Sequence, residues 1–216
     1  MTNLIMSELT IAIPRGRLER VTLALFARAG HSLDGQGDSR RLACHSESGT
    51  VRFIFVKPAD VPVYVEHGVA DCGVVGSDVL MESEADVLQP LSLELGACRI
   101  VVAAPQPTTE NGYTMLRVAT KYPRIARRFF GERGQPVEVI ELRGSVELAP
   151  ALGLADCIVD LVETGRTLLE NGLQIIELIA ESRAQLVVNR ASYQLKAAPI
   201  AKLISELKGA LVSGRG

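Results

Sequence analysis

The sequence predicts an α/β fold with two similar lobes, and two observations support this. Short apolar segments typical of strands alternate with segments of helical periodicity, as they do in α/β domains. A five-residue motif also occurs twice, as Gly68-Val-Ala-Asp-Cys72 and Gly153-Leu-Ala-Asp-Cys157, each time between a predicted helix and a predicted strand. The repeat favours two copies of one supersecondary unit with a ligand cleft between them. Chance reuse of a glycine that ends a helix explains it equally well.

The composition is that of an ordinary globular protein and disfavours several functional classes. Of 216 residues, 47% are hydrophobic and 22% are charged, and 23 basic residues against 25 acidic ones give a net charge of −2. This balance disfavours disorder and a role in coating nucleic acid, and an aromatic content of 4% offers few rings for base stacking. We therefore expect no nucleic-acid partner.

The N-terminal residues and the cysteines favour a cytoplasmic protein. The first residues lack the basic and apolar regions of a secretory signal, and no apolar run approaches the roughly 18 residues of a membrane span. The four cysteines form no C-x-x-C pair, so buried reduced thiols are favoured over disulfides or a zinc site. We expect a cytoplasmic location and no membrane contact.

Strands and helices alternate in the first half of the chain. Apolar residues recur at helical spacing along 18–26, and Asp60 is placed to cap a second helix. Gly76-Ser-Asp78 is expected to form a tight turn before a short third helix, and the polar stretch 34–41 a loop. Continuous apolar runs predict strands at 9–14, 51–56, 71–75, 93–95 and 100–104.

The second half continues this alternation, which favours largely parallel strand pairing. Helical periodicity and capping residues predict helices at 123–130, 146–152, 167–171 and 199–211. Apolar runs between turn residues predict strands at 116–120, 137–142, 156–161, 175–179 and 185–188.

The turn Thr164-Gly165-Arg166-Thr167 is the strongest candidate for a phosphate site. It follows an apolar strand and opens a helix, where backbone N–H groups without helical partners favour a bound phosphate. Gly165 allows close approach, and the two threonine hydroxyls add donors. The plain structural alternative is that Thr164 only caps the helix. The chain contains neither a G-x-x-x-x-G-K-[ST] nor a G-x-G-x-x-G motif.

Charged residues also follow several predicted strands. Glu141 and Asp160 each end a strand, where α/β folds place ligand-binding groups, and paired carboxylates suit ribose hydroxyls or magnesium. Arg15, Arg17 and Lys57 would stabilise a polyphosphate, including a departing pyrophosphate. Taken singly, each of these residues is also explained as a capping or solvated surface charge. The three histidines show no metal-ligand spacing.

Several motifs resemble those of the ATP phosphoribosyltransferase family. The core of the resemblance is Glu141-Leu-Arg-Gly-Ser-Val-Glu-Leu-Ala-Pro150, followed by Asp160-Leu-Val-Glu-Thr-Gly-Arg-Thr-Leu168 and Glu170-Asn-Gly-Leu173. Further matches lie in family order from about residue 9 to residue 200. They are Ile11-Ala-Ile-Pro-Arg-Gly-Arg-Leu18, the segment from Pro58 to Asp78, Ala119-Thr-Lys-Tyr-Pro123 and Val188-Asn-Arg-Ala-Ser192.

The resemblance implies a two-lobed fold like that of type II periplasmic binding proteins, with a cleft between the lobes. Lobe one would comprise 1–95 with 182–216, and lobe two 96–181. The implied reaction is attack by N1 of the adenine of ATP on C1 of phosphoribosyl pyrophosphate, which gives phosphoribosyl-ATP and pyrophosphate in histidine biosynthesis. Magnesium is implied as a cofactor that the substrate phosphates carry, with no dedicated metal ligands in the chain.

The resemblance also assigns roles to the candidate residues. Thr164, Gly165, Arg166 and Thr167 would hold the 5′-phosphate of phosphoribosyl pyrophosphate, and Glu141 and Asp160 its ribose hydroxyls or magnesium. Arg15 and Lys57 would be catalytic residues that stabilise the departing pyrophosphate. Arg15, Gly16 and Asp71 would bind ATP. Two departures from the family pattern weaken parts of this assignment: Lys57 stands where arginine is expected, and Ser77 replaces a basic residue.

The chain resembles the short form of the family, which has no C-terminal regulatory domain. The short form implies a histidyl-tRNA-synthetase-like regulatory subunit, a hetero-octamer, and histidine inhibition through that partner. A non-catalytic, two-lobed small-molecule-binding protein is the alternative of a different class, and the repeated motif motivates it. A non-catalytic homologue that serves as a scaffold is a third interpretation, based on Lys57 and Ser77.

Overall fold

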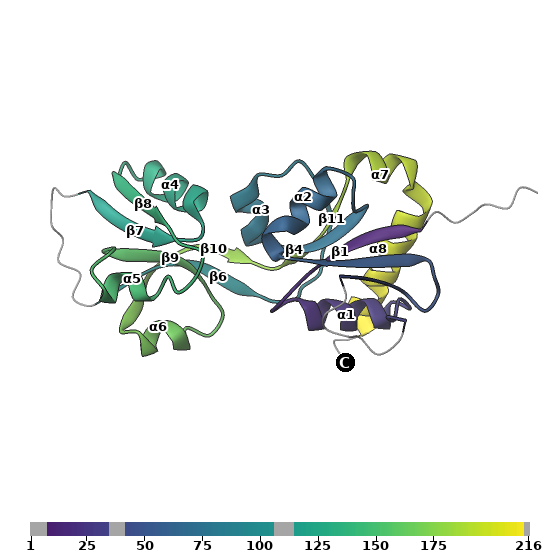
Figure 1. Ribbon diagram of the computed structural model, residues 1–216, viewed down its shortest axis with the longest axis horizontal. Coiled ribbons are helices and arrows are strands. Elements are labelled where there is room, and N and C mark those ends of the chain that lie inside the picture. The colour runs from purple at the N-terminus through teal and green to yellow at the C-terminus, as the bar shows by residue number, and fades with distance from the viewer. Residues whose placement is uncertain (1–7, 35–41, 106–114, 214–216) are drawn as a thin grey trace, which may run out of the picture. The chain divides into compact units, whose positions relative to one another are not determined.

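The computed structural model describes residues 8–34, 42–105 and 115–213. The chain divides into unit 1, Met1–Gly96 with Arg183–Gly216, and unit 2, Ala97–Ser182. Each unit contains one sheet with helices on both faces (Figure 1). Apart from Asp34, the stretch expected to form a loop at 34–41 and the N-terminal seven residues lie outside the described residues.

The sheet of unit 1 has the strand order β2-β3-β1-β4-β11-β5. Its central strand β1 (Leu9–Pro14) is almost entirely apolar and buried, as a parallel strand covered on both faces requires. β1 pairs in parallel with β3 (Val51–Val56) and β4 (Cys72–Gly76), so these three strands share a carboxyl edge. The other elements are β2 (Ala43–His45), β5 (Leu88–Ser92), β11 (Ala184–Val188), the 3-10 turn η1 (Pro58–Asp60), α1 (Glu19–Arg28), α2 (Val61–Glu66), α3 (Ser77–Ser83), α7 (Arg190–Leu195) and α8 (Ala197–Ser213).

Successive side chains of β1 contribute to two different hydrophobic clusters. Ile11 belongs to the cluster that includes Phe26 of α1 and Leu203 of α8. Its neighbour Ala12 belongs to the cluster that includes Val61 of α2. Because successive residues of a strand point to opposite faces, β1 is buried by a helical layer on each side (Figure 1).

The sheet of unit 2 has the strand order β10-β6-β9-β7-β8. β7 (Leu116–Thr120) pairs in parallel with both β8 (Val137–Glu141) and β9 (Cys157–Val162). Leu168 of α6 packs with Ala149 of α5 and Ile158 of β9 in one buried cluster. The remaining elements are α4 (Pro123–Glu132), α5 (Leu148–Ala151), α6 (Arg166–Glu170), β6 (Cys98–Pro105) and β10 (Leu173–Ser182).

The expectation of largely parallel pairing is wrong for several strands of both sheets. β11 runs antiparallel to β4, and β6 runs antiparallel to β9. The reason is the path of the chain between the units. Ala184 begins β11 opposite Gly76, the last residue of β4, and Arg99 of β6 lies opposite Val162, the last residue of β9. A strand that starts where its neighbour ends must run antiparallel to it.

Three shorter features also differ from expectation. The predicted strand at 93–95 lies earlier, at β5, which tolerates Pro90 because it is an edge strand of the sheet. Asp60 occupies the N-cap position of α2, but its side chain makes no capping hydrogen bond. α7 was not predicted, although the side chain of Asn189 caps it by accepting the Ser192 N–H at 2.9 Å.

The repeated motif of unit 1 connects β4 to β1. Gly68 has a φ of 70°, in the left-handed region that commonly ends helices. Oδ2 of Asp71 accepts the Thr10 N–H at 2.9 Å, and the Asp71 N–H donates to the Thr10 carbonyl at 2.8 Å. Oδ2 of Asp71 also lies 2.7 Å from Nζ of Lys196, which precedes α8. The aspartate therefore fixes the start of β4 against the central strand.

The second copy of the motif makes the same connection in unit 2. Gly153 has a φ of 71°. Oδ2 of Asp156 accepts the Arg117 N–H at 2.8 Å, and the Asp156 N–H donates to the Arg117 carbonyl at 2.9 Å. The guanidinium of Arg117 also donates to Oδ1 at 2.7 Å. The repeat is therefore one structural device present in both units, and we call it the aspartate clamp.

The two segments that lead between the units pair with each other. Within unit 1, the Leu93 N–H donates to the Ala184 carbonyl and the Ala184 N–H donates to the Leu95 carbonyl, both at 2.9 Å. Within unit 2, Cys98 pairs with Ser182. Gly96 has a φ of 59°, and a Cβ there would overlap with Cδ2 of Leu18, so this position requires glycine.

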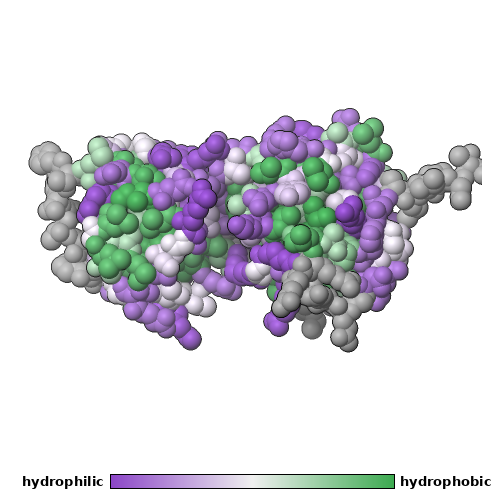
Figure 2. All heavy atoms as spheres, viewed as in Figure 1, coloured by the Kyte–Doolittle hydropathy of each residue, from purple (hydrophilic) through white to green (hydrophobic). Residues whose placement is uncertain are grey.

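Apolar side chains reach the surface in both units (Figure 2). Leu152 of unit 2 and Leu195 of unit 1 are 78% and 85% exposed. Within the described residues, no helix has both the length and the hydropathy that a membrane span needs.

The clamp of unit 2 predicts a pH-dependent contribution to stability. Hydrogen bonds from Arg117 hold the pKa of Asp156 below its ordinary value. A lowered pKa in the folded state stabilises the protein above the unfolded-state pKa of about 4, and this stabilisation is lost as pH falls through the folded-state value. We expect Asp156→Asn to lower the urea midpoint at pH 7 and at pH 5, with a difference from the parent chain that shrinks below about pH 4.

The matched control is Asp86→Asn, which disrupts the more exposed ion pair of Asp86 with Arg190. Its effect on the urea midpoint should be smaller at pH 7. A difference for Asp156→Asn that is unchanged down to pH 3 would contradict the assignment.

Candidate active site

The turn predicted to bind phosphate lies between β9 and α6. Gly165 is the N-cap residue of α6 and has a φ of 82°, a conformation that favours glycine. Leu168 is buried and anchors the helix, while Thr164, Arg166 and Thr167 are exposed. The first-turn amides of a helix have no partner within it, so the turn presents donors next to exposed hydroxyl and guanidinium groups.

Thr164 caps the helix only weakly, so a capping role alone does not explain this turn. It precedes the N-cap, and its hydroxyl accepts the Arg166 N–H at a long 3.4 Å. The helix begins at Arg166, one residue earlier than predicted. Capping therefore does not use the whole turn, and the Thr167 hydroxyl is exposed at the surface.

Glu141 and Asp160 lie at the same edge of the unit 2 sheet. Thr120 of β7 pairs with Glu141 on one side and with Val159 on the other. The backbones of Glu141 and of Val159, the residue before Asp160, are thus two strand spacings apart, about 10 Å. Glu141 ends β8 as predicted, but Asp160 does not end β9, which continues to Val162. The reason is that β9 leaves its parallel pairing with β7 after Val159 and goes on pairing with β6.

Sequence reasoning missed Lys121, which follows the strand that lies between those of Glu141 and Asp160. Nζ of Lys121 is 3.2 Å from Oδ1 of Asp160. Lys121 directly follows Thr120, the last residue of β7, so it emerges at the carboxyl end of that strand. A lysine directly after a predicted strand was the available signal, the same one that pointed to Lys57.

The predicted cations of unit 1 lie side by side at the carboxyl edge of its sheet. Arg15 and Gly16 follow β1, and Lys57 follows β3, its parallel neighbour. The Arg15 N–H donates to the carbonyl of Val56 at 2.8 Å, directly before Lys57. Gly16 has a φ of 92°, which turns the chain toward α1. The structure therefore brings these three predicted residues together.

Glu19 of α1 is a second residue that sequence reasoning missed. Its Oε1 accepts from Nη1 of Arg15 at 2.7 Å, and its Oε2 accepts the Gly16 N–H at 3.3 Å. The spacing of four residues between arginine and glutamate at a helix start could have revealed this pair. Because Glu19 engages the turn, an anion that binds Arg15 must compete with this carboxylate.

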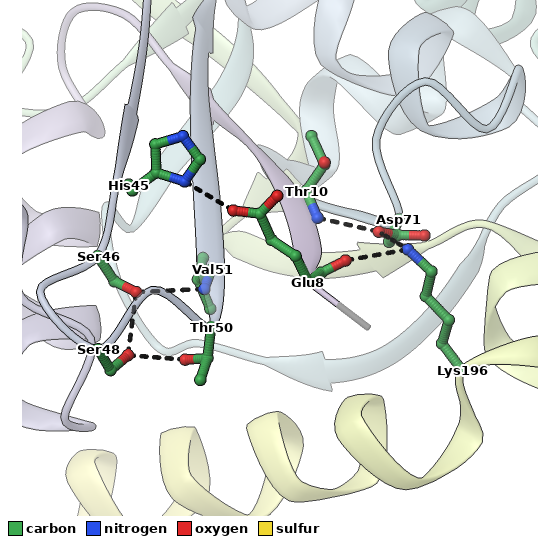
Figure 3. Close-up of polar contacts among 9 residues, drawn as sticks. All are labelled: Glu8, Thr10, His45, Ser46, Ser48, Thr50, Val51, Asp71 and Lys196. Atoms are coloured by element: carbon green, nitrogen blue, oxygen red, sulfur yellow. Dashed lines mark hydrogen bonds and ion pairs between the residues drawn. The ribbon is translucent and has the colours of Figure 1, made fainter. Parts of the chain in front are cut away.

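Asp71 lies at the opposite edge of the same sheet, and Figure 3 shows its contacts with Thr10 and Lys196. It pairs with Thr10, whereas Arg15 is five residues further along β1, about 17 Å away at the rise of a strand. Both oxygens of its buried carboxylate have partners: Ser192 Oγ donates to Oδ1 at 2.7 Å, and Lys196 and the Thr10 N–H bind Oδ2. The structure therefore does not bring Asp71 together with Arg15 and Gly16, the other residues predicted to bind ATP.

Ser77 contacts the returning chain at the start of α3. The Ser77 N–H donates to the Arg183 carbonyl at 2.9 Å, and the Ser77 hydroxyl accepts the Arg183 N–H at 3.2 Å. The predicted tight turn is the beginning of the helix itself, with Gly76 as its N-cap residue. Position 77 therefore has a structural contact of its own.

The cysteines, all within the described ranges, have free thiols. Burial and the preceding aspartate raise the pKa of Cys72 and of Cys157 to about 12, so both are protonated at neutral pH. Among the described residues no group of three or more histidine, cysteine, aspartate or glutamate side chains could hold a metal ion.

Comparison with solved structures defines the fold class. The periplasmic aliphatic sulphonate binding protein SsuA from Escherichia coli aligns with a TM-score of 0.61 and 13% identity, over 97% of this chain and 74% of that chain. At this identity the likeness shows the fold alone, and the chain has the predicted α/β fold of the periplasmic-binding-protein type. The ATP phosphoribosyl transferase (HisG:HisZ) complex from Thermotoga maritima aligns with a TM-score of 0.83 and 36% identity, over 95% of this chain and 99% of that chain.

Sequence comparisons then show the family. A relative from Caldanaerobacter subterraneus named ATP phosphoribosyltransferase is 47% identical over 210 residues, which are 97% of this chain and 100% of the relative. A relative of the same name from Geobacillus kaustophilus is 49% identical over 200 residues, 92% of this chain and 96% of the relative. The family model HisG: ATP phosphoribosyltransferase matches residues 57–209. The chain belongs to this family, which confirms the resemblance and favours a phosphoribosyltransferase over a non-catalytic binding protein.

The placement of Asp71 predicts that its substitution affects stability rather than ATP binding. Asp71→Ala would remove the acceptor of the Thr10 N–H and leave the Lys196 ammonium group with the Glu8 carbonyl in place of a carboxylate. We expect the free energy of unfolding to fall by about 3 kcal/mol, as measured by urea denaturation. The KM for ATP should stay within about twofold in the fraction that remains folded.

The milder variant Asp71→Asn keeps one acceptor oxygen, which can serve the Thr10 N–H while the amide group donates to the Ser192 hydroxyl. It therefore separates the two roles. A structural role predicts an intermediate loss of stability with unchanged kinetics. A raised KM for ATP without loss of stability would restore the ATP-binding role.

Proposed function

We propose that the carboxyl edges of the two sheets provide the substrate-binding residues of an ATP phosphoribosyltransferase. The family's reaction joins N1 of the adenine of ATP to C1 of phosphoribosyl pyrophosphate and releases pyrophosphate, the first step of histidine biosynthesis. The observation that supports the assignment most is the Gly165 turn, which exposes backbone and hydroxyl donors on the sheet that also presents Glu141 and Asp160.

At the edge of unit 2, the turn would hold the 5′-phosphate and the carboxylates would hold the ribose. Thr164, Gly165, Arg166 and Thr167 supply amide, hydroxyl and guanidinium donors, all suited to a phosphate dianion. Asp160 and Glu141 accept hydrogen bonds from ribose hydroxyls. Holding the ribose ring at both ends fixes the direction from which C1 can be attacked.

At the edge of unit 1, Arg15 and Lys57 would stabilise the pyrophosphate group. Because Gly16 has no side chain, ATP could approach the backbone closely at that position. Negative charge grows on pyrophosphate as the C1–O bond breaks, so cations fixed beside it favour the transition state. Lys57 acts as a point charge where an arginine would bind in a bidentate manner. The reaction needs little acid–base chemistry, so positioning and charge stabilisation supply most of the rate.

The donor set of unit 2 fits a magnesium ion that arrives with substrate. Magnesium keeps several water ligands and is commonly held by one or two carboxylates together with substrate phosphates. Glu141 is exposed and the side chain of Asp160 is 14% exposed, so they could supply such carboxylates. Bound there, magnesium would neutralise phosphate charge. We propose that the substrate phosphates carry the ion.

We also propose a partner and a cellular location. The solved relative from T. maritima is one chain of a HisG:HisZ complex, and 95% of this chain aligns with it. By this relationship the chain would assemble with a histidyl-tRNA-synthetase-like regulatory subunit in a hetero-octamer, where the partner binds histidine. The buried free thiols support a cytoplasmic location.

The phosphate role of the Gly165 turn predicts a selective kinetic defect. Gly165→Val combined with Thr167→Ala should raise the KM for phosphoribosyl pyrophosphate at least tenfold and leave the KM for ATP nearly unchanged. The matched control is Gly172→Val, which places the same side chain at another left-handed glycine, with a φ of 70°, beyond the other end of α6. Equal effects of the two variants would indicate backbone strain and contradict the phosphate role.

The activity itself is tested by an assay of phosphoribosyl-ATP formation from ATP, phosphoribosyl pyrophosphate and magnesium. The chain is assayed alone, with a purified histidyl-tRNA-synthetase-like subunit, and with that subunit and histidine. We expect turnover that histidine suppresses only when the partner is present. If the chain is folded but shows no turnover under any of the three conditions, the proposal is wrong.

A further inference from the structure

Lys121 lies at the centre of the edge that presents Glu141 and Asp160. β7 is the strand between β8 and β9, and Lys121 is the first residue after it. Its ammonium group lies 3.2 Å from Oδ1 of Asp160. We infer that Lys121 is a positioning residue for phosphoribosyl pyrophosphate, which acts by holding the Asp160 carboxylate in the orientation that accepts the ribose hydroxyls. The inference rests on the proposed role of Asp160.

The backbone at Lys121 is fixed by the residue before it. Thr120 is fully buried, and its hydroxyl donates to the carbonyl of Val159 at 2.6 Å, directly before Asp160. The same hydroxyl accepts the Tyr122 N–H at 2.8 Å, directly after Lys121. A single side chain thus ties the backbone on both sides of the Lys121–Asp160 pair. The lysine therefore leaves the sheet at a defined point beside the carboxylate.

The orientation of Asp160 depends on few groups. Its Oδ1 accepts the N–H of the following residue, Leu161, at 2.7 Å, and the same oxygen faces Lys121. Oδ2 is thereby left on the side away from these two donors, which suits a ribose hydroxyl. The Asp160 side chain is 14% exposed and that of Lys121 is 43% exposed, so the lysine reaches a largely buried carboxylate from the surface. The ammonium also offsets the repulsion between the carboxylate and the substrate phosphates.

The opposite end of the same two strands provides an internal comparison. Arg117 of β7 pairs with Asp156, four residues before Lys121 and Asp160 respectively. That pair makes two backbone hydrogen bonds and belongs to the aspartate clamp, whereas the Lys121–Asp160 pair has no backbone bond from the lysine strand to the carboxylate among the described residues. The Arg117–Asp156 pair joins the start of β9 to β7, and the Lys121–Asp160 pair lies at the edge at which we propose that substrate binds.

The test is a double-mutant cycle in the full chain, assayed with its regulatory subunit. Lys121→Met should raise the KM for phosphoribosyl pyrophosphate about tenfold, with the KM for ATP within about twofold. Asp160→Asn should raise the same KM at least as much. Because Lys121 acts through Asp160, adding Lys121→Met to Asp160→Asn should change the KM less than twofold further. Lys121→Arg keeps a cation and should recover most of the affinity.

Each other outcome has a separate meaning. If the effects of the two substitutions multiply, Lys121 contacts the substrate directly and the inference is wrong, while the role of Asp160 stands. If Lys121→Met alone changes nothing, the inference is wrong in the same way. If Asp160→Asn leaves the KM unchanged, the proposed role of Asp160 fails and the inference fails with it. Arg117→Met is the matched control for loss of a cation from the same strand and should lower the urea midpoint with an unchanged KM.

Discussion

The aspartate clamp determines where each sheet ends, and the candidate site depends on that. Asp71 and Asp156 fix the starts of β4 and β9 against the first parallel strand of their unit. Because a strand rises by a nearly constant distance per residue, fixing one end also sets the position of the other. The candidate binding residues follow the strands at that other end. Groups that stabilise each sheet and groups that would bind substrate are therefore separated along the length of the strands.

Much of the fold could be predicted because the patterns are local. The buried runs of β1 and β3 predict their bounds as observed, and the repeated motif indicates a shared unit in both halves. Pairing direction was not predictable in the same way. β11 and β6 run antiparallel to their neighbours because of the end at which the chain enters each sheet. The residues of these two strands do not indicate that direction. β5 was placed too late because Pro90 disfavours a strand unless the strand lies at an edge.

In the candidate site too, features that depend on neighbouring residues were predictable, and features that depend on distant residues were not. The conformation of Gly165 and the neighbouring hydroxyls was predictable from a strand, a glycine and a helix start. Asp71 was misplaced because an aspartate beside a strand gives no indication of which end it occupies or whether distant groups such as Ser192 and Lys196 already bind it. Lys121 was missed because its partner lies on another strand. Contacts between strands have no spacing signature in a single sequence.

The pairing of the two connecting segments has a consequence for how the chain folds during synthesis. Unit 2 is continuous in sequence, and its two ends meet at Cys98 and Ser182, so every strand of its sheet has emerged from the ribosome once residue 182 is free. Unit 1 is interrupted, and β11 fills the place between β4 and β5 only after unit 2 is complete. Unit 2 can therefore fold first, although it is made later. Until β11 is added, the N-terminal half exposes an unpaired strand edge, which makes it prone to aggregation and to binding by chaperones.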